Sequence, residues 1–299
     1  MQNKVYVITG PTSGIGLATA MQLAAYGTVI LVGRNKEKLG RVEKAIKEKG
    51  GRALAVVCDL ADILSVRRAA QQIVELQLPI AGLLNNAGVM LQKARKSAQG
   101  WDLSYATNHL GPFAFTEALV PHLPDGANVL FVASAIEDPE RKPVKLMGLK
   151  GARYISAEAS ARGEWLTPGS KLTGMDAYST SKQCILVAAM AFARETPRLH
   201  FNAVEPGITR GTNLGGEDTS AFMRFLFSRI MGLIPVFARY SSTPEKSART
   251  ITGILTSDAG VTGVYFDEKG RPMQGSVLAR DVKFQDRVVA ETRALLAKM

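Results

Sequence analysis

Length, composition and charge already exclude several classes of protein. The chain has 299 residues, 46% hydrophobic and 21% charged, which is typical of a soluble globular protein. Two cysteines, Cys58 and Cys184, cannot build a disulfide framework, and because each lies in an apolar run we expect buried, reduced thiols. Charges interrupt every apolar run and no leader segment opens the sequence, so we expect a cytoplasmic protein without a transmembrane segment.

The formal net charge of +11 raises the question of nucleic acid. Neither a recognition motif nor a basic run with interleaved aromatic residues accompanies this charge. We therefore favour a solvated basic surface, which also suits a polyanionic cofactor, over nucleic-acid binding.

Short apolar runs alternate with amphipathic stretches through the first half of the chain. This alternation predicts an α/β fold, a Rossmann-type doubly wound parallel sheet flanked by helices, as a single domain over 1–299. Two segments, 135–176 and 209–240, fall outside the pattern. The predicted strands are 5–8, 29–32, 53–57, 80–84 and 128–132, all buried on both faces, with later strands at 201–204 and 264–266; the predicted helices are 14–26, 36–49, 63–76 and 105–122.

A glycine-rich turn, Gly-x-x-x-Gly-x-Gly, joins the first predicted strand to the first predicted helix. Glycines here permit a tight turn and let backbone N–H groups at the helix N-terminus approach a pyrophosphate. The spacing differs from the commonest dinucleotide fingerprint, but its place between a strand and a helix favours a nucleotide site over a plain turn. The expected cofactor contacts are Gly10, Thr12, Ser13, Gly14, Ile15 and Gly16.

The end of the second predicted strand indicates which dinucleotide binds. An acidic residue about 20 positions after the glycines binds the ribose hydroxyls of NAD, whereas an arginine accommodates the 2′-phosphate of NADP. Here Gly33 is followed by Arg34 and Asn35, without a carboxylate to repel a phosphate. We therefore predict NADP(H) rather than NAD(H), with Arg34 and Asn35 among the cofactor-binding residues.

Polar residues also follow the third and fourth predicted strands. Asn86, Ala87 and Gly88 suit a backbone that passes close to the cofactor. Asp59, followed by Leu60, can accept a hydrogen bond from an adenine amino group, or can instead cap the next helix.

Two Tyr-x-x-x-Lys pairs occur, Tyr178 with Lys182 and Tyr265 with Lys269. Residues four apart share one face of a helix, so a helix beginning near Tyr178 brings its phenol and the ammonium of Lys182 together. In a strand, four residues span about 13 Å and side chains alternate, so Tyr265 and Lys269 do not converge. A nearby ammonium lowers the pKa of a tyrosine from its free value near ~10 toward the range useful for proton exchange.

Six motifs in order resemble the short-chain dehydrogenases/reductases, and the C-terminal tail is similar to the retinol dehydrogenase and WW-domain oxidoreductase-like branch. The resemblance implies that Ser134 hydrogen-bonds the substrate carbonyl and that Tyr178 exchanges its proton. Lys182 would bind the nicotinamide ribose, and Asn108 would hold a water of the proton relay. The motifs are the glycine turn, Asn85-Asn86-Ala87-Gly88, Asn108 in Thr-Asn-His-Leu-Gly, Ser134, Tyr178-x-x-x-Lys182 and Pro206-Gly207.

The chain departs from the family pattern in two places. Ser134 and Tyr178 are 44 positions apart, more than is usual, which predicts an insertion over 135–176. In the carbonyl reductases a comparable insertion accompanies a monomeric state, so we favour a monomer, with a dimer as the alternative. The turn after Pro206 and Gly207 is one residue longer than usual, so which threonine contacts the cofactor stays open, and we expect Ile208 to contact the carboxamide through its backbone.

The segment 209–240 is mostly apolar with periodic arginines. It suits a substrate lid, a core helix or a membrane-surface helix, and its place after the Pro-Gly turn favours the lid. An apolar lid predicts an apolar or aromatic substrate.

Together these features predict an NADP(H)-dependent oxidoreductase that interconverts a carbonyl and an alcohol on a small molecule, with reduction as the favoured direction and no metal. One alternative is a catalytically silent NADP(H)-binding regulator on the same scaffold. A light-driven enzyme of the protochlorophyllide reductase type is a more remote alternative.

Overall fold

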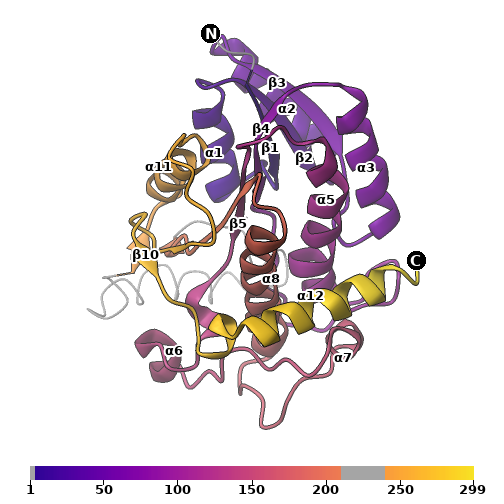
Figure 1. Cartoon of the computed structure of the whole chain (residues 1–299), viewed down its shortest axis with the longest axis vertical. Coiled ribbons are helices and arrows are strands. Elements are labelled where there is room, and N and C mark those ends of the chain that lie inside the picture. Colours follow the sequence, from indigo (N-terminus) through magenta and orange to yellow (C-terminus); the bar gives the residue numbers. More distant parts are fainter. Residues whose placement is uncertain (1–3, 210–239) are drawn as a thin grey trace.

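A central sheet organises residues 4–209 and 240–299, the parts of the chain that the computed structural model describes (Figure 1). Its strands are β1 (Val5–Thr9), β2 (Thr28–Gly33), β3 (Arg52–Val57), β4 (Ile80–Asn85), β5 (Asn128–Val132), β6 (His200–Val204), β9 (Tyr265–Phe266) and β10 (Pro272–Met273). They lie in the order β10-β9-β6-β5-β4-β1-β2-β3, and every neighbouring pair is parallel except β9 with β10. The order reverses at β1, which confirms the expected Rossmann-type doubly wound fold.

Two layers of helices cover the sheet, and each closes an apolar core. One layer contains α1 (Gly14–Leu23), α2 (Lys36–Glu48) and α11 (Pro244–Leu255), and the other contains α3 (Ile63–Glu75), α5 (Gly111–Leu119) and α8 (Met175–Glu195). Successive strand residues point to opposite faces, so Tyr6 and Ile8 pack toward α1 whereas Val5 and Val7 pack toward α3. A last helix, α12 (Val282–Leu296), packs across the outside of α8 (Figure 1).

The third strand corrects one expectation. β3 was predicted to be buried on both faces, but Leu54 is 37% exposed and Val57 is 47% exposed. β3 is the outermost strand and pairs with β2 alone, so part of its surface lies beyond the covering helices. Its apolar run is therefore an edge strand rather than a central one.

The predicted helix over 105–122 is broken into short pieces. α4 (Leu103–Tyr105) leads into a π-helical turn, η1 (Ala106–Leu110), which is followed by α5 and a 3₁₀ turn, η2 (Val120–His122). Pro112 lacks the N–H that would bond the carbonyl of Asn108 in an α-helix, so the regular pattern cannot continue here. Short π-helical turns of this kind are frequent at functional sites.

The segment 135–176, predicted as an insertion, packs against α8 and α12. It contains η3 (Ala135–Glu137), α6 (Lys142–Leu146) and α7 (Ala157–Arg162). The N–H of Arg153 donates to the Thr180 hydroxyl of α8 at 2.8 Å, and the Tyr154 hydroxyl donates to the Glu291 carboxylate of α12 at 2.6 Å. The segment thus ties the two helices together.

The composition also raised two questions, the state of the cysteines and the presence of membrane-spanning helices. Cys58 and Cys184 are both buried and free, as expected. Among the described helices, none combines the length and apolarity that a membrane crossing requires.

Candidate active site

The predicted site residues gather at the carboxyl ends of the parallel strands, where ligands bind in such sheets. The glycine turn follows β1, Asn86 follows β4 and Ser134 follows β5. The Tyr178 end of α8 reaches the same edge, because the Ser134 hydroxyl lies close enough to the phenol to lower its pKa. The fold therefore brings together residues that lie far apart in the sequence.

The glycine turn has the geometry that a dinucleotide requires. Gly10 has φ +68° and Gly14 has φ +53°, in the left-handed region that favours glycine. A Cβ on Gly16 would lie 2.1 Å from the Gly10 carbonyl oxygen, so only glycine allows α1 to start this close to β1. These residues form a tight turn that leaves backbone, rather than side chains, facing a ligand.

The N-terminus of α1 differs from those of its neighbours in a way that suits a phosphate. The exposed N-cap Ser13 makes no capping hydrogen bond with its side chain, and the first turn holds no acidic residue. By contrast, Asn35 caps α2 and Asp62 caps α3. Uncapped N–H groups at a positive helix end form a ready anion site, so the residues present fit the pyrophosphate of a dinucleotide.

Asn86 holds the glycine turn in place through hydrogen bonds. Its side-chain amide donates to the carbonyl oxygens of Thr9 at 2.9 Å and Gly10 at 3.2 Å. In return, the Thr9 hydroxyl accepts from the N–H groups of Asn86 and Ala87, each at 3.0 Å. This exchange locks the ends of β1 and β4 together, so Asn86 shapes the cofactor site whether or not it touches the cofactor.

The residues predicted to bind the adenosine half of the cofactor lie at the ends of the adjoining strands. Arg34 is exposed directly after β2, next to the glycine turn, because Gly33 faces Pro11. Asn35 accepts from the N–H of Lys38 at 2.9 Å as the cap of α2. Asp59 accepts from the N–H of Ala61 at 3.0 Å and forms a turn, whereas the cap of α3 is Asp62. The buried Leu60 packs against Gly111 at the start of α5.

Tyr178 and Lys182 lie on one buried face of α8. Tyr178 is 8% exposed and Lys182 is 4% exposed, and the Lys182 ammonium lies 5.7 Å from the centre of the phenol ring. Lys182 donates to the carbonyl oxygen of Val132 at 2.8 Å, which anchors it to the end of β5. The helical spacing therefore brings phenol, ammonium and the Ser134 hydroxyl into one group, as predicted.

The proton affinities of this group differ from the simple expectation. Burial raises the pKa of Tyr178, the Glu205 carboxylate raises it further, and the nearby Ser134 hydroxyl lowers it. Burial also lowers the pKa of Lys182 to about 8. The expectation of a lowered pKa at Tyr178 is therefore wrong for the protein alone, because burial dominates. At neutral pH the phenol is protonated and can donate a proton.

Asn108 joins the turn after β4 to α8. Its side-chain oxygen accepts from the N–H of Val89 at 2.7 Å, and its amide donates to the Val89 carbonyl at 2.8 Å and to the Ser181 hydroxyl at 3.0 Å. A Cβ on Gly88 would lie 3.3 Å from the Asn108 oxygen and 3.4 Å from the Lys182 ammonium nitrogen. Asn108, Gly88 and Lys182 are thus neighbours, and Ser181 is a contributor that the sequence reasoning missed.

The second Tyr-x-x-x-Lys pair does not come together. Tyr265 is buried in β9, whereas Lys269 is exposed beyond the turn. The Tyr265 hydroxyl is buried without a hydrogen-bond partner among the described residues, and it lies within electrostatic range of Tyr178 and Glu205. The tyrosine of the rejected pair therefore borders the site without sharing its chemistry.

Glu205 is the functional neighbour that sequence reasoning missed. It directly follows β6 and precedes Pro206, and its carboxylate is buried near Tyr178 and Lys182. An acidic residue at the end of the apolar run Phe201-Asn-Ala-Val was a signal, since parallel strands in the middle of a sheet are apolar.

The turn after Pro206 and Gly207 is well held. The Ile208 N–H donates to the Tyr240 carbonyl at 2.8 Å, so a carboxamide contact through this N–H requires that bond to be replaced. The Thr209 hydroxyl bonds within the turn, to the Gly207 carbonyl at 3.2 Å. Ile208–Thr209 form β7, which pairs with β8 (Ser241–Ser242). Thr212 lies outside the described residues. So does the lid predicted over 209–240, apart from its two end residues.

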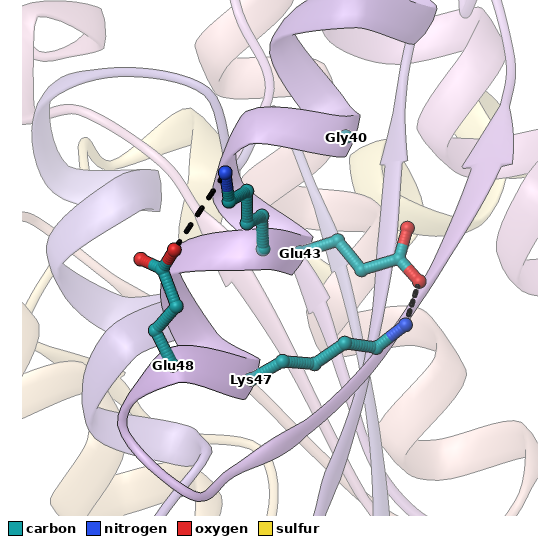
Figure 2. Close-up of a pocket in the computed structure, with 5 residues that line it drawn as sticks. Gly40, Glu43, Lys47 and Glu48 are labelled. Atoms are coloured by element: carbon teal, nitrogen blue, oxygen red, sulfur yellow. Dashed lines mark hydrogen bonds and ion pairs between the residues drawn. The ribbon is translucent and has the colours of Figure 1, made fainter.

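A surface hollow on α2 belongs to a different part of the molecule. Figure 2 shows its walls, the ion pairs of Glu43 with Lys47 at 2.6 Å and of Lys44 with Glu48 at 3.8 Å, beside Gly40. All five residues come from one exposed helix beside the β3 edge, and none comes from a strand end. The hollow is a solvated helix face and not part of the site.

The sequence is similar to those of known proteins. Residues 4–143 match the family model described as short chain dehydrogenase. The chain is 30% identical over 275 residues to retinol dehydrogenase 13 of Homo sapiens, across 88% of this chain and 76% of that protein. It is 38% identical over 302 residues to polyprenol dehydrogenase of Mus musculus, across 96% of this chain and 82% of that protein.

Solved structures share the fold. An uncharacterised protein of Mycobacterium paratuberculosis matches with a TM-score of 0.70 at 24% identity, over 99% of this chain and 94% of that one. A short-chain dehydrogenase of Shigella flexneri 2a, solved in complex with NADP, matches with a TM-score of 0.65 at 25% identity, over 90% of this chain and 98% of that one.

Proposed function

Because this chain belongs to the short-chain dehydrogenase/reductase family, in the branch of the retinol dehydrogenases, it is an oxidoreductase, and we propose that it interconverts a carbonyl and an alcohol with NADP(H). The family suggested by the six sequence motifs is thereby confirmed. One observation carries the proposal: Ser134, Tyr178 and Lys182 form one group at the strand ends that also carry the uncapped glycine turn.

The roles of the three side chains follow from their chemistry. Bound NADPH supplies the hydride in such a site. The Ser134 hydroxyl donates a hydrogen bond to the substrate carbonyl oxygen, and the protonated phenol of Tyr178 gives that oxygen its proton. The charge of Lys182 favours the resulting phenolate, and Asn108 holds the surrounding turn in place.

The preference for NADP(H) rests on Arg34. Its guanidinium is exposed at the end of β2, beside the glycine turn that suits the pyrophosphate. A guanidinium recognises a phosphate group through charge-assisted, often bidentate, hydrogen bonds. The NADP in the Shigella flexneri relative supports the same choice. The cofactor would rest on the glycine turn, on Arg34 and Asn35, on Asp59 and Leu60, on Asn86-Ala87-Gly88, and on Pro206-Gly207-Ile208.

The substrate that we propose is an apolar or aromatic small molecule. The names of the relatives, retinol dehydrogenase and polyprenol dehydrogenase, describe long apolar alcohols. Carbonyl reduction in the cytoplasm is the accompanying proposal for direction and location, and fractionation of cells that express the chain tests the location.

We propose that the protein is a monomer, because α12 covers the outer side of α8. In the family this helix commonly builds the tetramer interface. Here α12 packs across it, and Arg293 of α12 forms ion pairs with Glu117 of α5 and Glu195 of α8, both at 2.6 Å. A stable dimer or tetramer in light scattering would contradict this proposal.

An NADPH-consumption screen over aldehydes, ketones and quinones tests the function. Tyr178→Phe is the inactivating variant and Tyr265→Phe is the matched control, because Tyr265 loses only a hydroxyl without a hydrogen-bond partner in the described structure. We expect turnover that Tyr178→Phe abolishes and Tyr265→Phe retains. Tight NADPH binding without turnover of any carbonyl would instead indicate the regulator, which the intact Ser134, Tyr178 and Lys182 disfavour.

A further inference from the structure

Glu205 is a buried carboxylate that the reaction described above does not use. It is 8% exposed and directly follows β6. Alternation along β6 puts it on the face of Phe201 and Ala203, which pack in the same core as α8. Acidic side chains are rarely buried unless they have partners, so the partners of Glu205 indicate what it does.

Those partners are two backbone N–H groups from two different turns. One carboxylate oxygen accepts from the N–H of Ala135, the residue after Ser134. The other accepts from the N–H of Gly207 at 3.0 Å, in the turn that leads to Ile208. A single side chain thus joins the turn after β5 to the turn after β6, on either side of the place where substrate and nicotinamide would meet.

We propose that Glu205 is a positioning residue, whose carboxylate clamps these two turns together and so holds the Ser134 hydroxyl against the phenol of Tyr178. The inference rests on the proposed function, since it assigns Glu205 a part in the reaction of Ser134 and Tyr178. Glu205 itself touches neither substrate nor reacting atoms.

The clamp requires a carboxylate of this length. A glutamine offers one acceptor oxygen, so one of the two N–H groups would face its NH₂ group and lose its partner. An aspartate keeps the charge but is one methylene shorter, so it cannot reach both turns at once. In either case a buried donor is left unsatisfied, which displaces the turn after β5 that carries Ser134.

The charge of Glu205 has a separate, measurable effect. The titratable groups that face it are Tyr178 and Lys182 from α8, Tyr265 from β9, Glu268 beyond β9, and Arg141 before α6. Burial raises the pKa of Glu205, whereas the N–H groups of Ala135 and Gly207 and the charge of Arg141 oppose this rise and favour the carboxylate. The ionised carboxylate raises the pKa of Tyr178, so its removal lowers that pKa. Alcohol oxidation needs the phenolate. The rising limb of the pH–rate profile for oxidation therefore moves to lower pH when the charge is removed.

Three variants separate the clamp from the charge: Glu205→Gln, Glu205→Asp and the control Glu268→Gln. Glu268 lies beside Gly207 and makes no hydrogen bond to either turn among the described residues. We expect kcat to fall about tenfold in both Glu205 variants, with the KM for NADPH changed less than about twofold. The limb of the oxidation profile should move to lower pH in Glu205→Gln and stay in place in Glu205→Asp, and Glu268→Gln should match the wild type in kcat.

A second measurement on the free protein does not depend on turnover. Amide N–H groups that donate to a carboxylate resonate at characteristic NMR shifts, so the Ala135 and Gly207 signals should move in both Glu205 variants. In the control Glu268→Gln the Ala135 signal should stay unmoved, and Gly207 is not used there because Glu268 lies beside it. Unchanged kcat together with unmoved amide signals in Glu205→Gln would overturn the inference. If the wild type turns over no carbonyl, the proposed function fails, and the amide signals alone then support or overturn the clamp. If Glu205→Gln fails to fold, Glu205→Asp decides by the same two measurements.

Discussion

Two helices of this protein carry side-chain pairs at the same four-residue spacing, yet their surroundings are opposite. On α2, Glu43–Lys47 and Lys44–Glu48 form ion pairs at the protein surface, with only Glu43 partly buried (Figure 2). On α8, Tyr178 and Lys182 are buried, and burial shifts the pKa of both. Spacing alone therefore predicts that side chains meet, and burial decides whether their meeting has chemical consequences.

The burial of α8 comes from segments distant in sequence. The sheet covers one side, η1 and the segment 135–176 cover others, and α12 lies across the outside (Figure 1). α2 has a single apolar stripe of Leu39, Val42 and Ile46, and its other faces stay in water. The difference suggests four measurements, in order of decreasing effect.

The largest effect is expected for Tyr178→Phe. The substitution removes the proposed proton donor while keeping the ring, and general acids contribute about 10²–10⁴-fold to rate. We expect kcat for carbonyl reduction to fall within this range, with NADPH affinity nearly unchanged, as measured by single-turnover kinetics and fluorescence titration. Undiminished turnover in Tyr178→Phe would remove the basis of the proposed function.

Lys182→Met should have the next largest effect, and its signature is pH dependence. Burial lowers the pKa of Lys182 to about 8 in the free protein, so its ammonium is present below this pH and is lost as the pH rises through it. Wild-type NADPH affinity should therefore weaken across pH 8, whereas Lys182→Met should bind weakly and show no step there. Lys269→Met, the exposed lysine of the second pair, is the control and should keep the wild-type profile.

Arg34→Ala tests the cofactor preference. Loss of a charge-assisted contact to the 2′-phosphate should weaken NADPH binding by roughly tenfold or more and leave NADH binding nearly unchanged. The wild-type preference should also shrink as salt rises, because the arginine is exposed. Equal affinity of the wild type for NADPH and NADH in titration would contradict the assignment.

The smallest effect belongs to the exposed pair on α2. Glu43→Gln should change the free energy of unfolding by less than about 0.5 kcal/mol, since helix-surface ion pairs contribute little. Urea unfolding measures this change, and NADPH turnover should match the wild type. A loss of activity would mean that the α2 face, contrary to its geometry, communicates with the site.

The parts of the fold that local patterns determine were predictable. Several features depend only on residues that are close together in the sequence. They are the apolar runs of β1, β2, β4 and β5, the amphipathic periods of α2 and α3, the glycine turn and the Tyr178–Lys182 spacing. Their mutual placement followed from the rules of parallel sheets.

The features of the fold and of the site that were not predicted depend on contacts between residues distant in the sequence. The exposure of β3 follows from its edge position, and the break near Asn108 follows from Pro112 acting within a longer helix. The raised pKa of Tyr178 depends on cover from the segment 135–176 and on Glu205, neither of which its own helix reveals. A lone glutamate before a Pro-Gly turn gives no local indication that it will join this turn to the turn after β5.

The position of α12 at the end of the chain has a consequence for synthesis. α8 ends at Glu195, but the helix that covers its outer side begins at Val282. Ribosomes add roughly 5–20 residues per second, so the newly made α8 waits for seconds with an apolar side uncovered, a state prone to aggregation. A stop codon before Val282 would leave every predicted catalytic side chain encoded, yet deprive their helix of its outer support.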